Sequence, residues 1–140
     1  MSVSKLQNPD LGECLTSWLV NKPKRIIIVT DTAERVEAAK IRYFEICKLN
    51  YNLLGGSGGI DFPLVEASFI HSSLADKRSQ IVMAIRIVDT EMIVLLDENV
   101  RTPRLFLQEV IAVFEDPQVA LYGTKKQVRR RSYALVSSLS

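Results

Sequence analysis

Met92-Ile93-Val94-Leu95-Leu96-Asp97-Glu98-Asn99-Val100 is the stretch of sequence that decides the fold class. Its first five residues are all apolar, and they run directly into three polar residues. A continuous apolar run this short, ended by polar residues, is typical of a strand that is buried on both faces of a parallel sheet. We therefore predict a central parallel strand over residues 92–96.

The polar residues Asp97, Glu98 and Asn99 would then lie at the carboxyl end of that strand, where open α/β sheets bind their ligands. Carboxylate and amide oxygens are hard ligands that suit a divalent cation such as Mg²⁺ or Mn²⁺. Because Asp and Asn are also favoured helix caps, an alternative is that these residues only cap the helix that follows.

The composition is that of an ordinary globular domain. The chain has 140 residues, of which 47% are apolar and 24% charged, and its net charge of +2 gives no argument for a nucleic-acid partner. Cys14 and Cys47 lie far apart and form no metal-ligand pattern, so we expect reduced thiols in the core. No apolar run approaches the roughly 20 residues of a membrane helix, so we expect a soluble, cytoplasmic chain without a membrane span.

The rest of the chain alternates between helical and strand patterns. Residues 25–30 form a second apolar, β-branched run without alternation, and Pro103 is expected within the first turn of a helix. The expected strands are 25–30, 64–70, 92–96 and 119–123, and the expected helices are 11–19, Asp31-Thr32 to Cys47, 74–85 and 103–114. This order predicts an α/β fold with a mainly parallel sheet flanked by helices.

Two further positions are candidates for ligand binding. Asp31 follows the strand 25–30, where it either caps the next helix or accepts a hydrogen bond from a ligand in the crevice. Lys77 and Arg78 fall in the first turn of the helix 74–85, where cations oppose the helix macrodipole. A basic pair there would suit a diphosphate, and the alternative is a solvated charged face.

Other conspicuous residues are not expected to form a catalytic or ligand-binding site. The glycine-rich run 53–59 lacks the Gly-Lys-Ser/Thr ending of a P-loop and is better interpreted as a linker. His71 is the only histidine and has no partner pattern for a triad, and Arg129-Arg130-Arg131 is typical of a solvated surface. The residues alone thus predict a nucleotide-sized ligand at the carboxyl edge of the sheet, with or without a metal.

Several segments, taken in order, also resemble family 2 glycosyltransferases, in particular polysaccharide synthases of the hyaluronan or cellulose synthase type and fungal capsule-synthase-like members. The resemblance covers about residues 11 to 130. The segments that carry it are 13–31, Ala75-Asp76-Lys77-Arg78, 93–100 with Pro103, Phe114-Glu115-Asp116-Pro117-Gln118-Val119 and Gly123-Thr124-Lys125-Lys126-Gln127-Val128.

The resemblance implies an incomplete GT-A (Rossmann-like) nucleotide-sugar-binding domain. It also implies a nucleotide-diphosphate sugar donor, of the UDP-sugar kind, a divalent cation (Mg²⁺ or Mn²⁺), and a polysaccharide or oligosaccharide acceptor. By position, Asp31, Lys77, Arg78 and Asp97 would bind the donor, and Asp97 and Asn99 would bind the metal. Full-length relatives would be membrane proteins with a cytoplasmic catalytic face.

The sequence also departs from the family pattern. Asn99 replaces the final aspartate of the Asp-x-Asp motif and is a weaker ligand, and no candidate general base follows Arg131, so catalysis by this chain alone is uncertain. We expect a lead-in over 1–10, a donor-binding domain over 11–128 and a basic, serine-rich tail over 129–140. The alternatives are a non-catalytic α/β module that binds a protein and an unrelated small nucleotide-binding protein of flavodoxin-like shape.

Overall fold

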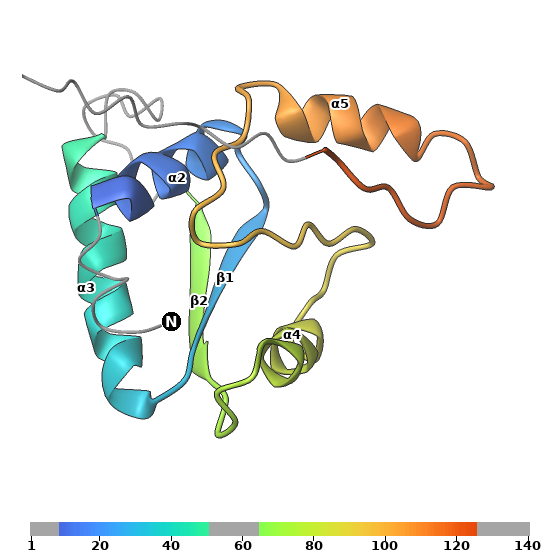
Figure 1. Cartoon of the computed structure of the whole chain (residues 1–140). Helices are drawn as coiled ribbons and strands as arrows, with labels where there is room; N and C mark the ends of the chain where they lie inside the picture. Colours follow the sequence, from blue (N-terminus) through green and yellow to red (C-terminus); the bar gives the residue numbers. More distant parts are fainter. Residues whose placement is uncertain (1–8, 51–64, 126–140) are drawn as a thin grey trace, which may run out of the picture.

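The computed structural model describes residues 9–50 and 65–125. Within these ranges the chain forms four helices and two strands (Figure 1). In chain order these elements are α2 (Pro9–Val20), β1 (Arg25–Thr30), α3 (Ala33–Leu49), β2 (Glu66–His71), α4 (Lys77–Ile85) and α5 (Phe106–Val113).

The two strands form a parallel sheet, with Arg25 opposite Glu66 and Thr30 opposite His71. Helix α3 connects them, as parallel strands require a crossover. Helices α3 and α4 lie on opposite sides of the strands (Figure 1), and α4 packs against both β1 and β2. The predicted α/β fold, with parallel strands flanked by helices, is confirmed.

One hydrophobic core joins α2 and α3 to one face of the sheet. Ile26 and Ile28 on β1 and Phe69 on β2 alternate toward this core, as the period of two in a strand requires. Its fully buried centre is Tyr43, whose ring packs edge-on against Phe69 at 5.5 Å between centroids. The Tyr43 hydroxyl donates to the carbonyl of Val65 at 3.0 Å, so the buried phenol is satisfied.

The two cysteines lie in this packed half of the molecule. Cys14 on α2 and Cys47 on α3 are both buried free thiols. Burial raises the pKa of each thiol, which keeps it protonated at neutral pH. The prediction of reduced core thiols is confirmed.

The predicted central strand over residues 92–96 is wrong. These residues form no regular secondary structure and pair with neither described strand, and Leu95 is 61% exposed. The predicted strand over 119–123 is also wrong, because that segment is irregular and Leu121 is 90% exposed. An apolar run becomes a buried parallel strand only where neighbouring strands receive it, and the described sheet contains only β1 and β2.

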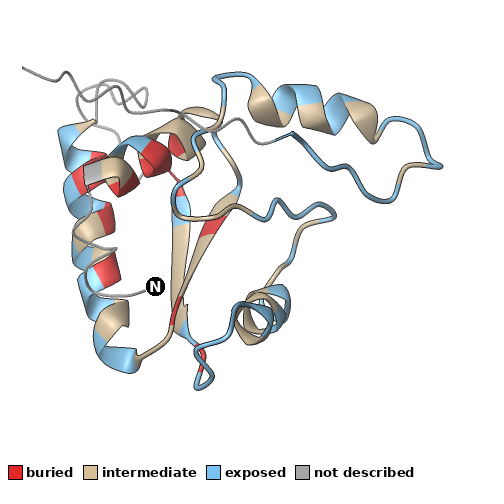
Figure 2. Ribbon diagram, viewed as in Figure 1, coloured by how far each residue is buried: buried red, intermediate tan, exposed pale blue. Residues whose placement is uncertain are grey.

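The buried residues are distributed unevenly among the helices and strands of the described structure. Figure 2 shows the buried residues gathered on α2, α3 and the strands, whereas α4 and α5 contain none. Helix α5 begins at Phe106, after a turn in which the Phe106 amide donates to the Pro103 carbonyl at 3.1 Å. Pro103 therefore precedes the helix, and its predicted place within the first turn is wrong.

Several predictions fall outside the described residues. These are most of the lead-in 1–10, the glycine-rich linker 53–59, the first residue of the predicted strand 64–70 and the tail 129–140. Among the described helices, none has both the length and the apolar character to cross a membrane.

Candidate functional site

The carboxyl ends of β1 and β2 share one edge of the sheet because the strands are parallel and in register. At this edge the Ser72 amide donates to the Thr30 carbonyl at 2.9 Å, which continues the backbone pairing one residue past the end of β2. Thr30 itself is fully buried, and its hydroxyl donates to the Thr32 carbonyl at 2.9 Å. The segments that leave the two strands, toward α3 and α4, thus start from one well-ordered edge.

Asp31 is the first residue after β1 and forms an ion pair with Arg35, one turn into α3. The helix cap is Thr32, whose hydroxyl oxygen accepts from the Arg35 amide at 3.4 Å, so the alternative in which Asp31 caps α3 is wrong. The hydrogen bond from Arg35 lowers the pKa of the Asp31 carboxyl below its ordinary value. Asp31 is therefore an ionised acceptor held beside a guanidinium.

Lys77 is the first residue of α4 and donates a hydrogen bond to the Asp97 carboxylate, twenty residues further along the chain. The helix itself is capped by Asp76, whose carboxylate accepts from the Ser79 amide at 2.8 Å and from the Ser79 hydroxyl at 2.6 Å. These bonds lower the pKa of Asp76. The ion pair with Asp97 places a carboxylate beside a cation that the helix macrodipole alone would disfavour.

Asp97 begins a tight turn that contains Asn99, and the Val100 amide closes this turn by donating to the Asp97 carbonyl at 3.1 Å. The alternative in which 97–99 caps the following helix is wrong, because α5 starts at Phe106 with Leu105 in the cap position. Arg78 follows Lys77 on α4 and is exposed. The structure thus joins Lys77 to Asp97 directly.

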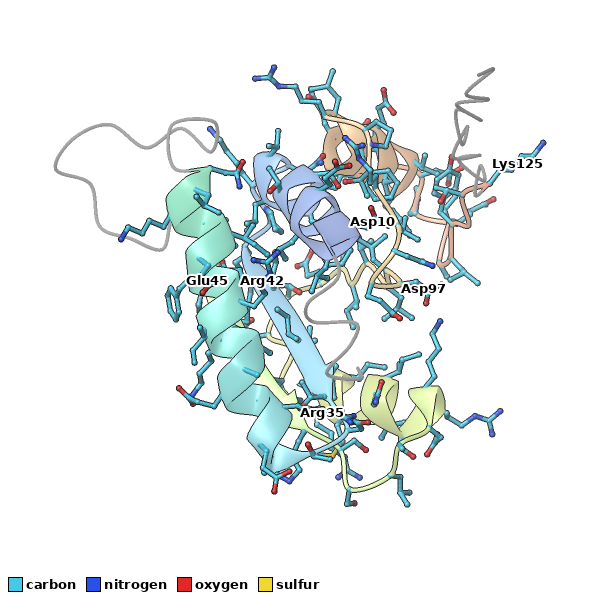
Figure 3. The ribbon with its side chains drawn as sticks, turned by 60° about the vertical axis from the view of Figure 1, so that its left-hand side comes forward. Asp10, Arg35, Arg42, Glu45, Asp97 and Lys125 are labelled. Atoms are coloured by element: carbon cyan, nitrogen blue, oxygen red, sulfur yellow. The ribbon has the colours of Figure 1, made fainter. Side chains whose placement is uncertain are left out.

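The predicted site residues form two separate groups. Asp31 lies with Arg35, and the labelled side chains in Figure 3 show Arg35 at the start of α3, well apart from Asp97. The second group is the pair of Lys77 and Asp97. A small hollow lies elsewhere, between α2, α3 and β1, and none of the five predicted site residues lines it.

A set of contacts from α2 holds the segment that carries Asp97. The Trp18 indole N–H donates to the Val100 carbonyl at 2.7 Å, and the Thr102 amide donates to the Ser17 hydroxyl at 3.0 Å. Asn21 bridges further along, since its side-chain amide nitrogen donates to the Pro103 carbonyl at 2.9 Å and its oxygen accepts from the Leu107 amide at 2.9 Å. Sequence analysis missed these residues. Their one signal is the spacing of polar Ser17 and Asn21, four residues apart beside Trp18 at the end of an amphipathic helix.

The residues that would bind a metal fit one poorly. The described residues contain no group of three or more His, Cys, Asp or Glu side chains arranged for a metal ion. Outside the described ranges, the only residue of these four types is Asp61. The Asp97 carboxylate accepts a hydrogen bond from the Lys77 ammonium, and Asn99 adds only a neutral amide. This donor set falls short of the six oxygen ligands that Mg²⁺ takes, unless phosphate and water supply most of them.

Comparison with known proteins gives one similarity of note. The chain is similar to a type 2 glycosyltransferase of Gibberella zeae, with 28% identity over 121 residues. The aligned region is 86% of this chain but 20% of that protein, so the chain spans about a fifth of the length of its relative. No family model matches the chain, and no solved structure matches it. The similarity supports a relationship to type 2 glycosyltransferases and leaves the polysaccharide-synthase subtype as a prediction.

Proposed function

We propose that this chain is a donor-binding domain of the glycosyltransferase type, which binds the nucleotide-diphosphate part of a sugar donor at the carboxyl edge of the β1–β2 sheet. The observation that carries the proposal is the ion pair of Lys77 and Asp97, two residues for which the family resemblance implies donor binding. The similarity to a type 2 glycosyltransferase supports the same chemistry. The proposed domain spans residues 11–128.

Each residue of the proposed site has a role that its chemistry suits. The ammonium of Lys77 has three N–H donors, of which one goes to Asp97, leaving donors for phosphate oxygens. Arg78, exposed on the same turn, adds a second cation for the diphosphate. Asp31 would accept a hydrogen bond from the base. Its ion-pair partner Arg35 lies apart from Asp97 in Figure 3, so we propose an extended ligand, such as a nucleotide-diphosphate sugar, that contacts both groups.

The reaction of the complete enzyme would transfer the sugar to a hydroxyl of a polysaccharide or oligosaccharide acceptor. The bond from the anomeric carbon to the leaving phosphate oxygen breaks, a bond to the acceptor oxygen forms, and the acceptor proton passes to a base. The cations near the diphosphate would stabilise the charge that develops on the leaving group. We propose a UDP-sugar as the donor class. The described residues fit Mg²⁺ or Mn²⁺ poorly, so the cations of this proposal are Lys77 and Arg78.

Calorimetric titration of the chain with UDP tests the proposal. We expect saturable binding, which Asp97→Ala weakens by roughly tenfold because the loss of a charge-assisted hydrogen bond releases the Lys77 side chain. Asp116→Ala is the matched control, since Asp116 is an exposed aspartate in the turn after α5, and we expect no change in affinity. Absence of binding by a chain whose circular dichroism shows it folded would overturn the proposal.

A specific observation favours a second candidate, the non-catalytic module that binds a protein. Helix α5 is strongly apolar, yet none of its residues is buried, and the run 92–95 is exposed as well. Exposed apolar surface of this kind marks protein interfaces in soluble proteins. A folded chain that does not bind UDP but elutes as a stoichiometric complex with a protein partner would favour this candidate.

A further inference from the structure

We infer that the ammonium of Lys77 takes the place of a divalent cation at Asp97, so that this chain binds the nucleotide diphosphate without a metal. The inference rests on the proposed function and identifies the counter-charge that the same site uses. It departs from the metal dependence that the family resemblance implies.

The first step is the arrangement of the pair. Asp97 offers a carboxylate that is 39% exposed, and Lys77 reaches it with a side chain that is 71% exposed. An exposed ion pair contributes little to the stability of a fold. The pair therefore adds little to folding, and its exposure leaves both groups accessible to a ligand from solvent.

The second step is that each partner is held by a different part of the fold. Helix α4 is capped by Asp76 and packs against both strands, which fixes the start of the Lys77 side chain. Asp97 sits in the turn closed by Val100, whose carbonyl is tied to Trp18. Lys40 and Glu37 differ in this respect, because they lie three residues apart and pair within the single helix α3.

The third step is the charge balance. In the ligand-free chain, a divalent ion bound to Asp97 would lie close to the Lys77 ammonium, and the single carboxylate would balance only part of their combined positive charge. Among the described residues, no group of three or more His, Cys, Asp or Glu side chains surrounds Asp97 to compensate for this charge. An ammonium, by contrast, can hold Asp97 with one N–H and a phosphate oxygen with another. Lysine is known to bind phosphate as a point charge in this way.

The test is a set of calorimetric titrations with UDP, each run in three conditions: with EDTA, with Mg²⁺ and with Mn²⁺. For the unmodified chain we expect the same affinity within about twofold in all three conditions. Lys77→Met should weaken UDP binding at least roughly tenfold in EDTA, because a charge-assisted contact to phosphate is lost. Lys77→Arg, which keeps the charge, should stay within about threefold of the unmodified chain.

Two controls separate the possible results. Lys40→Met removes the lysine of the pair within α3 and should leave the UDP affinity unchanged. Circular dichroism of each variant establishes that it is folded. Binding of UDP by the unmodified chain that requires Mg²⁺ or Mn²⁺ would overturn this inference and leave the proposed function standing. Absence of UDP binding in every condition would overturn both.

Discussion

The indole N–H of Trp18 donates to the carbonyl of Val100 at 2.7 Å and so joins α2 to a segment 82 residues further along the chain. This bond lies three residues after Asp97, at the end of the turn that carries the proposed donor-binding carboxylate. Ser17 on the same helix and Asn21, the first residue after it, hold the next residues of the same segment. The position of Asp97 is therefore set by α2, although α2 contributes no residue to the proposed site.

Trp18→Phe should remove this bond while keeping an aromatic ring against the core. We expect a loss of about 1 to 2 kcal/mol in the free energy of unfolding, because the hydrogen bond is lost and the Val100 carbonyl no longer has its indole donor. Urea denaturation measures this loss. The Thr102 amide donates to Ser17 and the Leu107 amide donates to Asn21. Hydrogen exchange should also become faster at these two amides, and not at amides within α3. Equal exchange rates in the two proteins would contradict the role of Trp18 as the anchor of this segment.

The elements that sequence analysis placed correctly have a strong local signal and a partner to pack on. Residues 25–30 are apolar and β-branched, and they form β1 because β2 pairs with them and α3 covers them. The run 92–96 has an equally strong local signal but no paired neighbour among the described strands. Strand formation depends on cross-strand neighbours more than on intrinsic preference, so the pattern alone could not distinguish the two cases.

The candidate site, too, could be predicted from the sequence only in part. Lys77 and Asp97 were each predicted as donor-binding residues, but nothing local relates two residues twenty positions apart, and their ion pair emerges only from the fold. The pairing of Asp31 with Arg35 did have a local signal. The two residues are four apart across the start of a predicted helix, a spacing at which opposite charges meet.

The pair of Asp31 and Arg35 should make stability depend on pH at the acidic end. Arg35 lowers the pKa of Asp31 in the folded chain below the unfolded value of about 3.9, so the pair stabilises the fold above that pH. The stabilisation is lost as the pH falls through the folded pKa, when the carboxyl takes up a proton. Arg35→Ala should return the pKa of Asp31 toward its ordinary value and flatten this part of the stability curve.

Carbon-13 NMR titration of the Asp31 carboxyl, together with thermal denaturation at a series of pH values below 5, measures both effects. Lys40→Ala is the control, because Lys40 is a cation on the same helix that pairs with Glu37 instead. An Asp31 titration that is unaffected by Arg35→Ala would show that another group lowers its pKa.

Paired leucine substitutions test whether the run 92–96 is the exposed segment of this structure or the buried strand that its sequence predicts. Leu15 on α2 is 2% exposed and belongs to the core, so Leu15→Ala should cost about 2 to 5 kcal/mol of the free energy of unfolding. Leu95 is 61% exposed, so Leu95→Ala should change that free energy by no more than about 0.5 kcal/mol. The two substitutions delete the same atoms, and urea denaturation of both variants therefore compares burial alone. If Leu95→Ala cost as much as Leu15→Ala, residues 92–96 would be packed in solution as a strand, and the turn that carries Asp97 would lie at the carboxyl end of a wider sheet.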